Sequence, residues 1–172
     1  CRGLHARYES AELMFTDAVC EKTFAVNEQL SFPGGKPKPS QLVTQCVSFA
    51  MGETQLIGTK VIVKGTVNIT LCYLSNEVNY PVRAEFSTPF SQIIDTGEEQ
   101  MEHCSAVIEL TSCYCDIIDT INGEKALDAE IHAVLQLVCH SRQSVSYISD
   151  VYSNLMPAEF TAQTRQLGTS SA

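Results

Sequence analysis

Eight cysteines and four histidines are the residues of this sequence whose chemistry could define a function. This cysteine load is high for a cytosolic domain, and the spacing is too wide for a small disulfide-stapled scaffold. No two cysteines have the C-x-x-C spacing of zinc ribbons or thioredoxin-like sites. The compartment, reducing or oxidising, is therefore open at this point. The cysteines are Cys1, Cys20, Cys46, Cys72, Cys104, Cys113, Cys115 and Cys139.

An Asn-Gly dipeptide at 122–123 predicts a hairpin, because it is the strongest two-residue turn signal and both positions would take positive φ. With these two residues as the loop, one face pairs apolar side chains: Ile118 with Leu127, Tyr114 with Ile131, Leu110 with Leu135, and Ile108 with Leu137. The other face is mixed, and a one-residue slip would drive it into the core. A longer loop would shift this register.

The mixed face carries the sharpest candidate for a chemical site. Cys113 lies there opposite His132, and Cys115 opposite Glu130, with the two sulfurs about 7 Å apart on one side of the strand. These four side chains could hold a zinc ion, although flat sheet faces seldom close tetrahedrally around a metal. Disulfide bonds between copies and plainly packed thiols are the other two interpretations. We expect no bound metal and no cofactor.

Enzymatic catalysis is not expected from this sequence. A nucleophile needs a base beside it, and the chain has no G-x-S-x-G elbow and no acidic residue at a telling spacing from a histidine. With Lys+Arg 11 against Asp+Glu 20, the net charge of -9 would repel a nucleic-acid backbone or an anionic membrane surface. Nucleic-acid binding is therefore not expected. No stretch approaches the roughly 20 apolar residues that span a bilayer, so membrane insertion is not expected either.

Short alternating segments dominate the chain and predict its fold class. Residues 61–73 alternate almost without error, and residues 82–86 can pair back on them as a hairpin. Residues 14–30 and 46–57 also look extended. Because long helices are missing, we expect an all-β fold, an antiparallel two-sheet sandwich or barrel-like domain with extended terminal arms.

Two further segments, 40–43 and 89–95, are interpreted as short turns. The core of the two packed sheets is expected to contain the inward-facing apolar residues of both hairpins. These are Val61, Val63, Val67, Ile69, Leu71, Ile108, Leu110, Tyr114, Leu127, Ile131, Leu135 and Leu137.

Several segments together resemble a known family. The chain reads Gly-Thr-Lys-Val-Ile-Val-Lys-Gly at 58–65, Leu-Cys-Tyr-Leu-Ser at 71–75, Tyr-Pro-Val at 80–82, Pro-Phe-Ser-Gln-Ile-Ile-Asp at 89–95, Ile-His-Ala-Val-Leu at 131–135 and Asp-Val-Tyr-Ser at 150–153. In this order and spacing it resembles the SPOCS domain of sporulation proteins from clostridia and relatives. The resemblance implies an all-β domain, often in tandem copies, that acts in spore envelope assembly through protein contacts without catalysis. The cysteine load and the residues around 122–123 depart from the family pattern.

With this resemblance, the chain divides into an N-terminal arm or linker at 1–19, a SPOCS-like β domain at 20–154, and a C-terminal arm or linker at 155–172. We expect a structural subunit that assembles with copies of itself, and with other spore-coat proteins, into a spore-associated layer or fibre. The location would be the spore surface or an extracellular fibre. The alternative is a monomeric adaptor that recruits another spore-coat assembly protein in the mother-cell cytoplasm, at the forespore surface.

The two ends are expected to contact other copies more than their own domain. A polar tail buries too little apolar surface to offset the roughly 1 to 2 kcal/mol of backbone entropy that each ordered residue loses. Adding a strand to a neighbouring copy would supply main-chain hydrogen bonds and pockets for apolar side chains. The residues expected at contacts between copies are Cys1, Cys20, Cys113, Cys115, Leu4, Leu13, Met14, Leu155, Met156 and Phe160.

Overall fold

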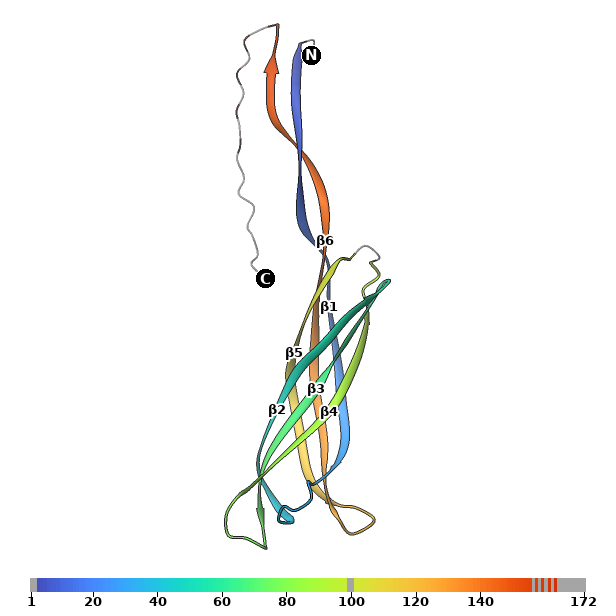
Figure 1. Cartoon of the computed structure of the whole chain (residues 1–172), viewed down its shortest axis with the longest axis vertical. Coiled ribbons are helices and arrows are strands. Elements are labelled where there is room, and N and C mark those ends of the chain that lie inside the picture. The colour runs from blue at the N-terminus through green and yellow to red at the C-terminus, as the bar shows by residue number, and fades with distance from the viewer. Residues whose placement is uncertain are drawn as a thin grey trace. The chain divides into compact units, whose positions relative to one another are not determined.

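The computed structural model describes residues 3–98 and 101–155, together with 157, 159, 161 and 163. Within these residues the chain forms six strands: β1 Leu4–Ser31, β2 Pro39–Ile57, β3 Lys60–Ser75, β4 Val82–Asp95, β5 His103–Asp119 and β6 Lys125–Ser153 (Figure 1). They form two three-stranded sheets, in the orders β1-β6-β5 and β2-β3-β4. The all-β prediction is confirmed, and two separate sheets fit its sandwich form. In the part of the chain described, there is no helix long and apolar enough to cross a membrane.

The chain divides into two compact units. Residues 15–141 form one unit, here called the body, and residues 1–14 with 142–172 belong to the other. The described strands of the second unit, residues 4–14 of β1 and 142–153 of β6, are here called the ribbon. These divisions fall at 14/15 and 141/142, whereas the sequence suggested 19/20 and 154/155. Both β1 and β6 therefore contribute residues to each unit.

The hairpin of β3 and β4 follows directly from the alternation in the sequence. Tyr73 lies opposite Val82 and Leu71 opposite Ala84, and all four side chains are buried. The pairing continues to Lys60 opposite Asp95, so the turn predicted at 89–95 is wrong. Proline is tolerated there because β4 is an edge strand of its sheet. The turn predicted at 40–43 is also wrong, since β2 already begins at Pro39 and pairs with β3.

The register predicted for the second hairpin is wrong by one residue near the loop. The loop runs from Thr120 to Glu124, closed by the Thr120 amide donating to the Glu124 carbonyl at 2.8 Å. Gly123 has a φ of 77°, but Asn122 does not share a positive φ, so the dipeptide does not form the two-residue turn. The longer loop pairs Ile117 with Leu127.

A β-bulge at position 111 shifts the register again. Leu110 lies opposite Ala133 and Ser112 opposite His132, which leaves Thr111 as an extra residue in β5. Side chains that alternate on one face before the bulge continue on the other face after it. The core prediction is therefore wrong for Tyr114, which is 62% exposed, and for Leu110, which is 43% exposed; Ile108 is partly buried.

The other nine predicted core residues are buried, and the sandwich interior has two clusters. One cluster contains Ile69, Leu71, Leu127 and Ile131, with the rings of Phe24, Phe49 and Phe90 packed together. The other contains Val61, Val63, Leu135, Leu137 and Cys139. This interior holds the body together and fixes which side chains reach its surface.

Candidate assembly surface and cysteine sites

The ribbon pairs the two ends of the described chain with each other. The Asn154 amide donates to the Gly3 carbonyl at 3.2 Å, and the Ser149 hydroxyl donates to the Arg7 carbonyl at 3.3 Å. The ring of His5 stacks on that of Tyr152, with centroids 5.2 Å apart. The N-terminal segment is therefore a strand of the chain's own sheet. Contact with other copies remains a prediction.

Large apolar side chains of the ribbon face solvent. In a strand, successive side chains point to opposite faces, and here both faces carry them: Tyr147 is 47% exposed and its neighbour Ile148 is 54% exposed. A two-stranded ribbon is marginally stable in water unless a third strand or a packed layer supports it. The exposed set in the ribbon is Leu4, Tyr8, Met14, Val145, Tyr147, Ile148 and Tyr152, and the exposed Leu155 follows two residues after the ribbon ends. These residues form the strongest candidate for an assembly surface.

The two units differ in net charge. Residues 1–14 and 142–172 contain four basic and four acidic side chains, so this unit is neutral with histidines uncharged. The body has seven basic and sixteen acidic side chains and so carries the whole net charge of -9. Bodies of two copies repel each other, whereas the terminal segments can approach without this cost.

The structure places the residues predicted at contacts between copies in different environments. Leu4, Met14 and Leu155 are exposed, and Leu13 is partly buried. Cys20 packs against the body cluster that contains Cys139. Cys1, Met156 and Phe160 lie outside the described residues.

The four residues of the proposed metal site are not brought together. Because of the corrected register, Cys113 lies opposite Ile131 and Cys115 opposite Ala129, and both thiols pack against the interior cluster. His132 is on the other face, where its Nε2 lies 2.8 Å from the Glu130 carboxylate. The two sulfurs are 3.5 Å apart, and no group of three His, Cys, Asp or Glu side chains suited to a metal occurs in the described part of the chain.

Burial and the neighbouring Cys113 thiol raise the pKa of Cys115 to about 12. At about pH 8 we therefore expect iodoacetamide to label the exposed Cys46 and to leave Cys115 unlabelled, because the thiolate is the reactive form. Peptide mass spectrometry of the native protein measures this. The thiol of an unfolded cysteine has a pKa of about 8.5. Because folding raises the pKa of Cys115, the protonated thiol contributes to the free energy of unfolding fully below that pH, and this contribution is lost as the pH rises toward 12. Equal labelling of both cysteines would contradict the buried placement.

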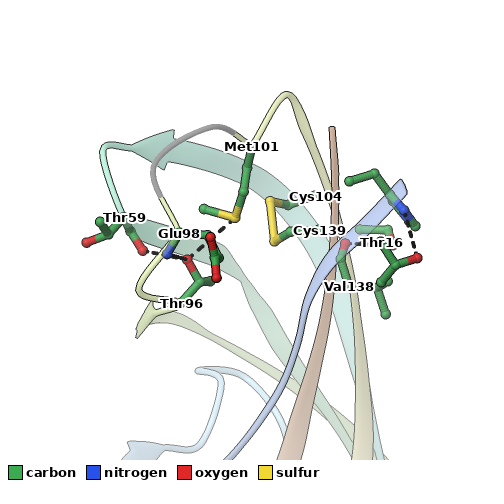
Figure 2. Close-up of a disulfide and its surroundings, with 10 residues drawn as sticks. Thr16, Thr59, Thr96, Glu98, Met101, Cys104, Val138 and Cys139 are labelled. Atoms are coloured by element: carbon green, nitrogen blue, oxygen red, sulfur yellow. Dashed lines mark hydrogen bonds between the residues drawn. A yellow bond between two sulfur atoms is a disulfide. The ribbon is translucent and has the colours of Figure 1, made fainter. Parts of the chain in front are cut away.

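A disulfide joins Cys104 of β5 to Cys139 of β6, which lie directly opposite each other in the ladder. Figure 2 shows it beside Met101, whose sulfur accepts a hydrogen bond from the Thr96 hydroxyl at 3.4 Å. The sequence prediction missed this pair, because its register placed Cys104 opposite Ser141. The loop and the bulge each shift the register by one residue, and only both shifts together make the two cysteines partners, so local alternation could not identify the pair.

Comparison with known families supports the resemblance seen in the sequence. The family model described as SipL, SPOCS domain matches residues 41–118, which run from β2 to the end of β5. Among curated proteins no significant match was found. No solved structure matches the chain significantly either. The resemblance to the SPOCS domain family is thus confirmed over residues 41–118, and it indicates a sporulation-related protein.

Proposed function

We propose that this protein is a structural, non-catalytic subunit that assembles with copies of itself into a spore-associated layer or fibre. The observation that carries the proposal is the ribbon, whose large apolar side chains are exposed on both faces. The match to the SPOCS family supports a role in sporulation. A second copy is the occupant that fits this surface, because the unit that contains the ribbon has no net charge, whereas each body has a net charge of -9.

The cysteines support a location outside the reducing cytoplasm, at the spore surface or in an extracellular fibre. A disulfide between Cys104 and Cys139 persists in oxidising surroundings and is rare in the cytosol. Of the free cysteines that the structure describes, Cys46 is the one with an exposed residue surface, on the outer side of β2. An intermolecular disulfide through Cys46 would hold neighbouring copies together covalently, as a second link beside the ribbon.

The alternative is a monomeric adaptor, and one feature of the body favours it. A shallow hollow lies at the β5 bulge and is lined in part by Thr23, Thr111, Tyr114 and His132. The exposed Tyr114 ring offers an anchor of the kind that dominates protein contacts. An adaptor would bind another spore-coat assembly protein there while remaining monomeric.

Replacing two exposed tyrosines of the ribbon by serine should prevent assembly without unfolding the body. We expect the full chain to form oligomers or filaments, seen by sedimentation velocity and negative-stain electron microscopy. The double variant Tyr8→Ser with Tyr147→Ser should shift the protein to a monomer, because both rings are lost from the ribbon surface.

The matched control is Tyr80→Ser, which removes an equally exposed ring from the body. This variant should assemble as the parent does. A parent protein that stays monomeric at high concentration would favour the adaptor, and oligomers that survive the double variant would exclude the ribbon as the assembly surface.

A further inference from the structure

One long edge of the ribbon belongs to β6. In the body, β6 lies between β1 and β5, and its ladder with β5 extends from Asp119 opposite Lys125 to His103 opposite His140. Beyond His140, among the residues that the structure describes, β6 pairs with β1 alone. Residues 144–152 thus form an edge of the kind that adds a strand from another chain.

Aliphatic residues lie at equal distances on either side of Ile148 along this edge. Residues 145–151 read Val-Ser-Tyr-Ile-Ser-Asp-Val. When two copies of the segment run antiparallel with Ile148 at the centre, Val145 lies opposite Val151, Tyr147 opposite Ser149, and Ile148 opposite its own copy. Each apolar residue at the centre and at both ends meets another apolar residue, and each Asp150 meets Ser146. No two like charges are opposed within 145–151, and such pairs of apolar residues stabilise neighbouring strands.

We propose that two copies of the chain pair antiparallel through residues 144–152 of β6 and form one four-stranded sheet in the order β1-β6-β6-β1. This inference rests on the proposed function, because it requires that copies associate. It adds which strand of the ribbon makes the contact, in which direction and in which register.

The charge distribution favours this antiparallel direction. In the proposed register, Ser141 of each copy lies opposite Leu155 of the other, so the two points where β6 leaves the bodies are about 45 Å apart along the strands. This separation is several times the Debye length of about 8 Å at physiological salt. A parallel pairing would instead place the two Ser141 residues, each joined through the chain to a body of net charge -9, at the same end of the sheet.

The other edge of the ribbon is less suited to the same contact. Antiparallel pairing of two β1 edges about the middle of residues 4–14 would place Glu9 opposite Glu9 of the second copy. Like charges directly opposite each other destabilise a strand pair. The Glu9 carboxylate already accepts a hydrogen bond from the Tyr147 hydroxyl at 3.4 Å within the ribbon.

Cysteine cross-linking of the full chain tests both the contact and the register. In Ile148→Cys, the two new side chains of a dimer have Cβ atoms about 5 Å apart, close to the separation of about 3.5–4.5 Å in a disulfide. Mild oxidation should therefore give a dimer band on a non-reducing gel well above the dimer that the native cysteines give in the parent chain. Ile148 is 54% exposed, so the substitution leaves the interior intact.

Ser146→Cys is the matched control, because its side chain would lie about 13 Å from its copy along the strand. It should show no more dimer than the parent chain, which measures the background from the native cysteines. Val145→Cys and Val151→Cys should each resemble the parent alone and should form dimer when the two variants are mixed.

The outcomes separate this inference from the proposed function. If sedimentation shows association but Ser146→Cys cross-links as strongly as Ile148→Cys, or the mixture gives no additional dimer, the register is wrong while self-assembly stands. If the parent protein remains monomeric throughout, both the inference and the proposed function fail.

Discussion

Replacing Cys104 and Cys139 together by alanine is expected to lower the free energy of unfolding by about 3–4 kcal/mol, because the bond closes a loop of 35 residues in the unfolded chain. Cys139 is fully buried among Val61, Val63 and Leu137, so the alanine variant also loses packing there. Urea unfolding under oxidising conditions measures the difference. Parent protein in reductant should lose a similar amount, whereas the double variant should be insensitive to reductant.

Cys72→Ala is the control for this experiment, since Cys72 is a free cysteine on the neighbouring sheet. It should leave the response to reductant unchanged. A parent protein whose stability does not depend on reductant would show that the bond does not form in solution, and would remove the main support for an oxidising location.

The disulfide lies close to the end of the body, a few residues before β6 continues into the ribbon. Cys139 precedes Arg142 by three residues, so the bond fixes β5 to β6 close to where their ladder ends. At the same end, the Glu102 amide donates to the His140 carbonyl at 2.9 Å. These two links oppose fraying of the body at the point where β6 continues into the ribbon.

Local pattern was sufficient to predict β3 and β4, and insufficient for β5 and β6. In residues 61–73 every second residue except Gly65 has an apolar or aromatic side chain, and only one register buries these six side chains. In the second hairpin, a loop of five residues and one extra residue at Thr111 decide the register. Neither leaves a clear trace in the alternation, because a one-residue slip still pairs apolar residues such as Ile117 with Leu127.

Three features depended on contacts that no local pattern records. The metal-site hypothesis failed with the register, because the bulge turns Cys113 toward the interior and leaves His132 outside. The disulfide was missed for the same reason. The pairing of residues near Gly3 with those near Asn154 joins segments about 150 positions apart, and strand periodicity identifies faces but not partners.

Leu135→Ala and Leu110→Ala should differ sharply in stability, although the sequence alone placed both residues in the core as direct partners. Leu135 is fully buried, so its truncation leaves a cavity and should cost about 2–5 kcal/mol. Leu110 is 43% exposed beside the bulge, where solvent replaces the lost methyl groups, and its truncation should cost about 1 kcal/mol or less. Urea unfolding of the two variants measures both values.

This comparison tests the effect of the bulge on which leucine is buried, because the chemical change, Leu to Ala, is the same in both variants. In the predicted register the two leucines lie opposite each other in the core, and equal losses would follow. In the observed register Leu135 lies opposite Ile108, and Leu110 opposite Ala133. Equal losses would therefore support the register predicted from the sequence. In that register Cys113 and His132 lie on one face, and the metal-site hypothesis would again be possible.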